Sequence, residues 1–134
     1  MRTIIVGYDG SDPARRALER VADLARNGDA VTVVSAVPLR VNSLGPVRPE
    51  SAEVQESERE LDEAAAVLAT RGIFCRRFSE WGNPADVIID EANELDADLI
   101  VVGSTGKNVI ERHVLGSVSS DLVHRAPCDV LVVR

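Results

Sequence analysis

Short apolar segments alternate with longer amphipathic ones along this chain, and this alternation limits the fold more than any other feature of the sequence. Five short segments rich in β-branched residues are expected to form strands: residues 3–8, 30–37, 73–80, 98–102 and 129–133. Between them, apolar residues recur at helical spacing after Asp12, over 51–71, from Pro84 and over 116–125. Such an alternation folds as an open parallel sheet with helices on both faces. We therefore predict a single α/β domain of Rossmann-like architecture over residues 1–134.

Capping residues indicate where the helices begin. Asp12 is expected to cap the first helix, with Pro13 in the first helical position, and Asn83 followed by Pro84 repeats this arrangement. The segment Leu39–Glu50 contains prolines and a glycine that break any period. We expect an irregular loop there, either a flap over a ligand or a plain connection.

Two strand orders fit this pattern, 2-1-3-4-5 and 3-2-1-4-5, with the strands numbered along the chain. The third predicted strand carries Arg76 and Arg77, which suits an edge strand and favours the order 3-2-1-4-5. That order places Tyr8–Gly10 beside Gly103–Gly106 at the carboxyl end of the sheet. Ligands of open α/β sheets bind at such a point, so we predict the site in this crevice.

The segment GSTGKNVIERHVLGS, residues 103–117, has the physical attributes of a phosphate cradle. Gly103 is expected to let a ligand approach the backbone, and Gly106 to adopt a positive φ that turns amides inward. Gly116 and Ser117 open the last helix, whose free N–H groups favour an anion. The spacing is not that of a Walker A loop, and by themselves the glycines fit an ordinary connecting loop equally well.

The spacing Gly103-x2-Gly106-x9-Gly116-Ser117 resembles the nucleotide-binding signature of the universal stress protein family. The start of the chain, IIVGYDGSDPARRAL, resembles the first strand and helix of that family, so the resemblance covers essentially the whole chain. It implies the 3-2-1-4-5 sheet and ATP binding, because members that keep these glycines bind ATP.

The resemblance also implies individual roles. Asp9 is expected at the ribose, Val37 at the adenine through its backbone, and Val102 and Gly103 along adenine and ribose. The phosphate contacts are expected at small residues and their neighbours: Gly106, Gly116, Ser117, Val118 and Ser119. Three further residues are expected to line the same turns: Tyr8, Gly10 and Thr105. No catalytic residue and no metal ligand is assigned, and Mg²⁺, where present, would be held through the phosphates.

Three functions are compatible with these features. The favoured one is an ATP-binding regulatory protein of the stress response, read by client proteins that the sequence does not identify. The alternative is a slow ATPase or nucleotidyl-transfer enzyme on the same fold; it is disfavoured because Glu111 is the single carboxylate placed near the phosphate loop. The third, a ligand-free dimerisation module, conflicts with the intact glycines. The family often forms homodimers through its last strands, and Asp129–Val133 is an apolar edge suited to this.

Composition and cysteine spacing argue against nucleic acid, a membrane and a metal as partners. The net charge of -7 argues against a broad nucleic-acid surface, and no apolar run is long enough to span a membrane. Cys75 and Cys128 lack the spacing of a metal site, which predicts reduced thiols and a cytoplasmic protein. Lys107 and Arg112 are expected to contact either phosphate or solvent. Surface or packing roles are expected for His113, His124 and Trp81.

Overall fold

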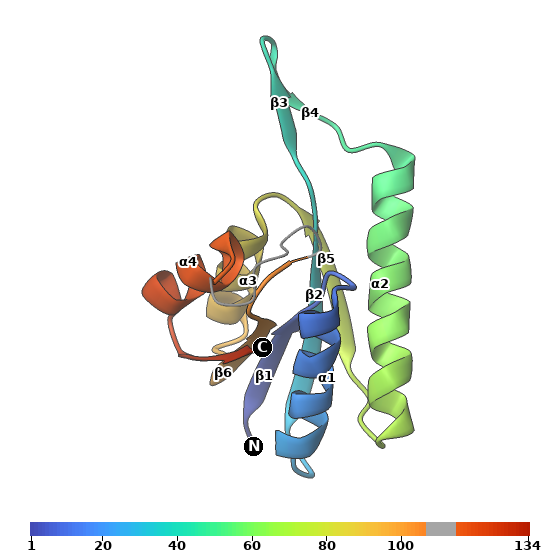
Figure 1. The fold of residues 1–134 in the computed structure, drawn as a ribbon, viewed down its shortest axis with the longest axis vertical. Helices are drawn as coiled ribbons and strands as arrows, with labels where there is room; N and C mark the ends of the chain where they lie inside the picture. Colours follow the sequence, from blue (N-terminus) through green and yellow to red (C-terminus); the bar gives the residue numbers. More distant parts are fainter. Residues whose placement is uncertain (107–114) are drawn as a thin grey trace.

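A five-stranded parallel sheet forms the centre of the molecule in the computed structural model, which describes residues 1–106 and 115–134 (Figure 1). Its strands are listed in chain order: β1 (Thr3–Gly7), β2 (Ala30–Val37), β5 (Arg76–Trp81), β6 (Leu99–Gly103) and β7 (Asp129–Val133). They lie in the order β5-β2-β1-β6-β7, and every neighbouring pair is parallel. The predicted order 3-2-1-4-5 is confirmed, and the alternative 2-1-3-4-5 is wrong.

Two helices cover each face of the sheet (Figure 1). The four are α1 (Asp12–Leu24), α2 (Ser51–Thr70), α3 (Pro84–Glu94) and α4 (Ser117–Arg125). Side chains of α1 and α2 share one apolar cluster with Ile4 and Val6, whereas α3 and α4 share the other with Ile5. Because successive side chains of β1 enter opposite cores, the strand is apolar throughout, as expected of a central parallel strand. None of the helices described is long and apolar enough to cross a membrane.

The segment 39–50 is more regular than predicted. It contains an antiparallel hairpin of β3 (Arg40–Asn42) and β4 (Gly45–Val47) that extends away from the central sheet (Figure 1). The Asn42 side chain accepts a hydrogen bond from the N–H of Leu44 at 2.8 Å, and Gly45 adopts a φ of +114°. These two features reverse the chain, so the expectation of an irregular loop was wrong.

Capping differs from the prediction at one helix and matches it at another. Ser11, and not Asp12, caps α1, because its hydroxyl accepts a hydrogen bond from the N–H of Ala14 at 3.3 Å. Asp12 is instead the first helical residue, where its negative charge interacts favourably with the positive end of the helix dipole. The predicted cap at Asn83 is confirmed, since its side chain accepts from the N–H of Ala85 at 3.0 Å.

Candidate functional site

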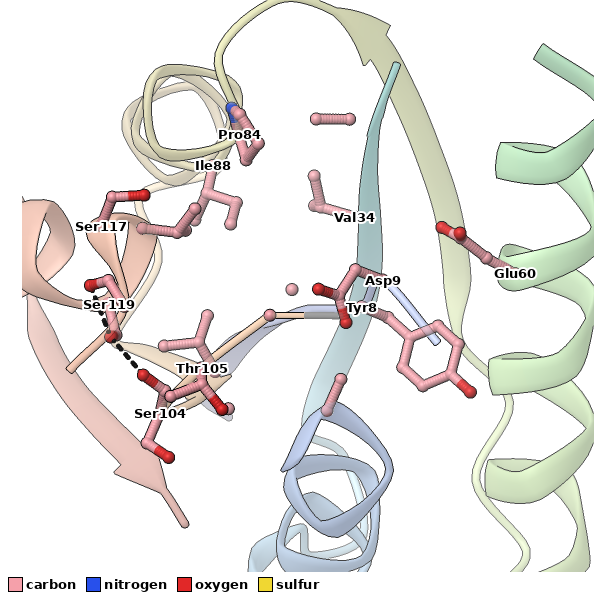
Figure 2. A pocket seen from close by; sticks show the side chains of 18 residues that line it. Tyr8, Asp9, Val34, Glu60, Pro84, Ile88, Ser104, Thr105, Ser117 and Ser119 are labelled. Atoms are coloured by element: carbon pink, nitrogen blue, oxygen red, sulfur yellow. Dashed lines mark hydrogen bonds between the residues drawn. The ribbon is translucent and has the colours of Figure 1, made fainter. Parts of the chain in front are cut away.

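A cavity of about 280 Å³ lies at the carboxyl ends of β1, β2 and β6 (Figure 2). This volume is close to the lower end of the range of small-molecule sites, roughly 300–1,000 Å³. Most of the residues assigned to the nucleotide site line it: Tyr8, Asp9, Val102, Gly103, Thr105, Gly106, Gly116, Ser117, Val118 and Ser119. Gly10 and Val37 do not line it.

The N-terminus of α4 forms one side of the cavity. Gly116 occupies the N-cap position and offers no side chain to cap the helix. The first hydrogen bond of the helix runs from the N–H of Ser120 to the Gly116 carbonyl at 3.0 Å. The N–H groups of Ser117, Val118 and Ser119 precede that bond and have no carbonyl within the helix to pair with. These three residues line the cavity, so the positive end of the helix dipole lies against it.

The Ser119 hydroxyl has a structural partner. It is only 1% exposed and donates to the Ser104 carbonyl at 2.8 Å, with the Gly116 carbonyl at 3.1 Å (Figure 2). The Ser104 carbonyl also accepts from the Gly116 N–H at 2.7 Å, which fixes the start of α4 against the end of β6. Ser119 is therefore available to a ligand through its backbone N–H. Its hydroxyl proton is used in the hydrogen bond to Ser104, which links α4 to the end of β6.

Asp9 and Tyr8 are adjacent in sequence but face different surroundings. One carboxylate oxygen of Asp9, Oδ1, accepts from the Ser11 N–H at 2.9 Å, and Figure 2 shows the carboxylate among the cavity residues. The Tyr8 ring is 3% exposed and points toward α2, where its hydroxyl donates to Glu63 (Figure 2). Burial, and then this hydrogen bond, raises the pKa of Tyr8 to about 12. Tyr8 thus borders the cavity with its backbone, and Gly10, at a φ of +79°, shapes the turn.

The glycines of the signature bring backbone segments close together. A Cβ on Gly103 would lie 2.8 Å from the Ala14 nitrogen and from the Pro13 carbonyl carbon, so this glycine lets α1 pack against β6. A Cβ on Gly116 would lie 3.3 Å from the Thr105 Cα. Gly106 is not among the glycines with positive φ, and that expectation was wrong. Its missing side chain instead leaves room for Asp9 Oδ2, which would lie 3.1 Å from a Cβ there.

The backbone of β2 identifies Ala36, and not Val37, as the residue that faces the cavity. Gly7, the last residue of β1, pairs with Val34, and the Tyr8 N–H donates to the Val34 carbonyl at 2.9 Å. The Val37 carbonyl accepts from the Gly82 N–H, on the β5 side. Since backbone groups of alternate residues point to opposite neighbours, the N–H and C=O of Ala36 point beyond the end of β1.

Eight residues of the lining were given no individual role from the sequence: Gly7, Ala14, Val34, Ala36, Glu60, Pro84, Ile88 and Ser104. The apolar ones lie in predicted strands and helices, and nothing local in the sequence distinguishes a core residue that also lines a cavity. Glu60 comes from α2, a helix with many charged positions, and nothing local in the sequence separates a glutamate that lines a cavity from one that faces solvent. The flap interpretation also finds no support, since no residue of 39–50 lines this cavity.

Four proposed roles, those of Lys107, Glu111, Arg112 and His113, lie outside the described residues. His124 Nδ1 lies 2.8 Å from the Ser120 carbonyl within α4, and Trp81 packs against the Arg48 guanidinium, 5.9 Å from the ring centroid. Neither residue lines the cavity. Within residues 1–106 and 115–134, no group of three or more His, Cys, Asp and Glu is placed to hold a metal ion.

Comparison with known proteins gives a consistent result. The model of the universal stress protein family matches residues 1–134. Universal stress protein UspA from Lactobacillus plantarum is 28% identical with a TM-score of 0.76, covering 99% of this chain and 97% of that one. A universal stress protein in complex with cAMP is 28% identical with a TM-score of 0.77, over 99% and 97%. The Archaeoglobus fulgidus protein in complex with dAMP is 28% identical with a TM-score of 0.75, over 100% and 98%.

Proposed function

Because the chain belongs to the universal stress protein family, we propose that it binds ATP in this cavity and acts as a nucleotide-dependent regulatory protein of the stress response. One observation carries the proposal: the cavity between the β1 and β6 ends is bordered by the uncapped N-terminus of α4. The adenine nucleotides named for two similar structures support the ligand class. On this proposal, the whole chain, residues 1–134, is one universal stress protein domain.

The phosphates belong at the α4 end of the cavity. The N–H groups of Ser117, Val118 and Ser119 offer three donors, and the helix dipole adds a favourable potential for an anion. Backbone donors of this kind are fixed by the fold and lose little entropy when a ligand binds. Mg²⁺ would enter with the phosphates, because it is commonly held by substrate phosphates together with one or two carboxylates. No protein ligand to Mg²⁺ is assigned, because Asp9, which lines the same cavity, is assigned to the ribose.

The nucleoside belongs at the opposite end of the cavity. The side chains of Val34 and Ile88 give it apolar walls, which suit the faces of a purine. The N–H and C=O of Ala36 present a donor and an acceptor to the edge of the base, matching the ring nitrogen and amino group of adenine. Asp9, between the base and phosphate ends, takes the ribose hydroxyls.

Ser117 offers a direct test of the phosphate assignment. Ser117→Asp places a negative charge at the first turn of α4. This charge interacts favourably with the helix dipole, so the helix is retained, but it repels a phosphate. Ser117→Asn has nearly the same shape without the charge and serves as the control. By isothermal titration calorimetry we expect Ser117→Asp to weaken ATP binding more than tenfold, while Ser117→Asn and the affinity for adenosine change little. Equal ATP affinities in the two variants would place the phosphates elsewhere.

We further propose a homodimer formed through β7. Among the described residues this strand is the last of the sheet, and no described strand pairs with its side away from β6. The cytoplasmic assignment also stays a proposal; it rests on two free thiols, Cys75 and Cys128, whose pKa values burial raises. The proposed role requires no turnover of ATP. Release of phosphate faster than about 1 per second would instead favour the enzyme alternative.

A further inference from the structure

We propose that Glu60 selects the base of the nucleotide, favouring one that carries an amino group over one with a carbonyl at the same position. This inference rests on the proposed function, since it assumes a nucleotide in the cavity. Glu60 projects from α2 into the lining of that cavity, on the far side from Ser117 and Ser119 (Figure 2). This carboxylate therefore lies away from the end of the cavity that is assigned to the phosphates (Figure 2).

A chain of buried hydroxyls holds the Glu60 carboxylate in place. The Ser57 hydroxyl donates to the Ser35 hydroxyl oxygen at 2.8 Å, and the Ser35 hydroxyl donates to Glu60 Oε2 at 3.1 Å. Ser35 and Ser57 are 2% and 4% exposed. Both protons point toward Glu60, because Ser35 accepts from Ser57 and keeps its own proton for the carboxylate. Glu60 Oε2 is thus the acceptor at the end of this chain.

Core packing alone does not account for these hydroxyls. Ser35 stands in β2 in a position equivalent to that of Val33, two residues earlier, whose side chain enters the core shared with α1 and α2. A hydroxyl buried at such a position costs free energy unless it is hydrogen-bonded. The hydrogen bonds to Ser57 and Glu60 compensate that cost and fix the orientation of Glu60. This geometry is expected where a carboxylate must keep one position toward a ligand.

The position of Glu60 relates it to the base. Ser35, its hydrogen-bond donor, immediately precedes Ala36, whose backbone faces the cavity. An adenine amino group has two hydrogens, and the Ala36 carbonyl can accept one of them while the Glu60 carboxylate accepts the other. A base with a carbonyl at that position, as in inosine, would place its oxygen against two other hydrogen-bond acceptors, the Ala36 carbonyl and the Glu60 carboxylate. Sites that bond a polar group in this way reject analogues that lack it, since buried groups are left unpaired.

The experiment compares the affinities of ATP, ITP and 2′-deoxy-ATP by titration calorimetry. The unmodified protein is expected to prefer ATP over ITP at least tenfold. In Glu60→Gln this preference should fall by about tenfold to a hundredfold, because the amide can turn its NH2 toward a carbonyl. Glu58→Gln, an exposed change two residues earlier on α2, should leave the preference intact. Ser35→Ala removes the donor that orients Glu60 and should lower it by a smaller factor.

Each remaining outcome counts against a defined part of the argument. An unchanged ratio of ATP to ITP affinity in Glu60→Gln, with ATP still bound, would overturn the inference and leave the proposed function standing. A change confined to the ratio of ATP to 2′-deoxy-ATP would assign Glu60 to the ribose and equally overturn it. Failure of the unmodified protein to bind any of the three nucleotides would refute the proposed function itself, and the inference with it.

Discussion

Replacing Gly103 with alanine separates a structural role of the signature glycine from a ligand-binding one. The added Cβ would lie 2.8 Å from the Ala14 nitrogen, the Pro13 carbonyl carbon and the Pro13 Cβ. Two of these three atoms belong to the backbone of α1, so a side-chain rotation cannot relieve the overlap. The helix must instead move away from β6, and α1 packs against the main apolar core through Leu18 and Val21.

The size of the effect follows from two opposing terms. Overpacking of this kind costs roughly 1–3 kcal/mol, and backbone contacts place Gly103→Ala in the upper half of that range. The φ of Gly103 is outside the left-handed region, so alanine also reduces the entropy of the unfolded chain and returns about 0.4–1 kcal/mol. We expect a net loss of about 1–2.6 kcal/mol in the free energy of unfolding.

Urea unfolding of the ligand-free protein measures this loss. For an m-value of about 2 kcal/mol/M, the midpoint should fall by roughly 0.5–1.3 M. Gly106→Ala is the matched comparison, because its Cβ would contact only the Asp9 carboxylate at 3.1 Å. It should leave the midpoint nearly unchanged and weaken ATP binding. If Gly103→Ala leaves the unfolding midpoint unchanged and affects only ligand affinity, the packing argument is refuted.

Three further predictions concern the described residues. Tyr8→Phe should cost about 1 kcal/mol of stability without changing ATP affinity, because it removes a hydrogen bond to Glu63, a residue that does not line the cavity. As the pKa of Tyr8 is raised, this contribution is present below about pH 10 and lost between about pH 10 and 12, which pH-dependent unfolding would detect. Asp29→Asn should flatten the acid limb of the stability curve. Backbone N–H groups, and then the Arg2 guanidinium, hold the pKa of Asp29 well below its usual value, so its contribution is present above about pH 4 and lost below it. Val132→Pro should reduce the dimer mass in light scattering, since the N–H of Val132 points away from β6; an unchanged mass would indicate another interface.

The order of the strands could be predicted from the sequence because a single physical contrast determined it. Arg76 and Arg77 stand out in a set of otherwise apolar strands, and a charged strand is stable at an edge where its side chains reach water. The structure places both arginines in β5, at the edge. The hairpin could not be predicted in this way, because its apolar side chains Val41 and Leu44 are 72% and 95% exposed and create no period.

The position of the proposed adenine contact shows where such prediction ends. Val37 and Ala36 are consecutive in an apolar strand, and no property of the sequence ranks one above the other. A shift of one residue in a strand reverses the direction of its backbone groups, so the difference decides between a contact with β5 and a contact with the ligand. That decision depends on where β1 ends relative to β2. The register of Gly7 against Val34 supplies this information, and it exists only in the assembled sheet.

The glycine spacing makes the same point for the phosphate end. The idea that glycine admits a ligand by lacking a side chain does not explain Gly103, because the space that its side chain would take is occupied by Pro13 and Ala14 of α1. Gly116 has a packing role as well, because it lets α4 begin against Ser104 and Thr105, with its own N–H bonded to the Ser104 carbonyl. The two close approaches bring α1 and α4 to the same end of β6. The amides of the first turn of α4 then line the same cavity as Asp9, so a packing requirement creates the proposed anion site without any described lysine or arginine among the lining residues.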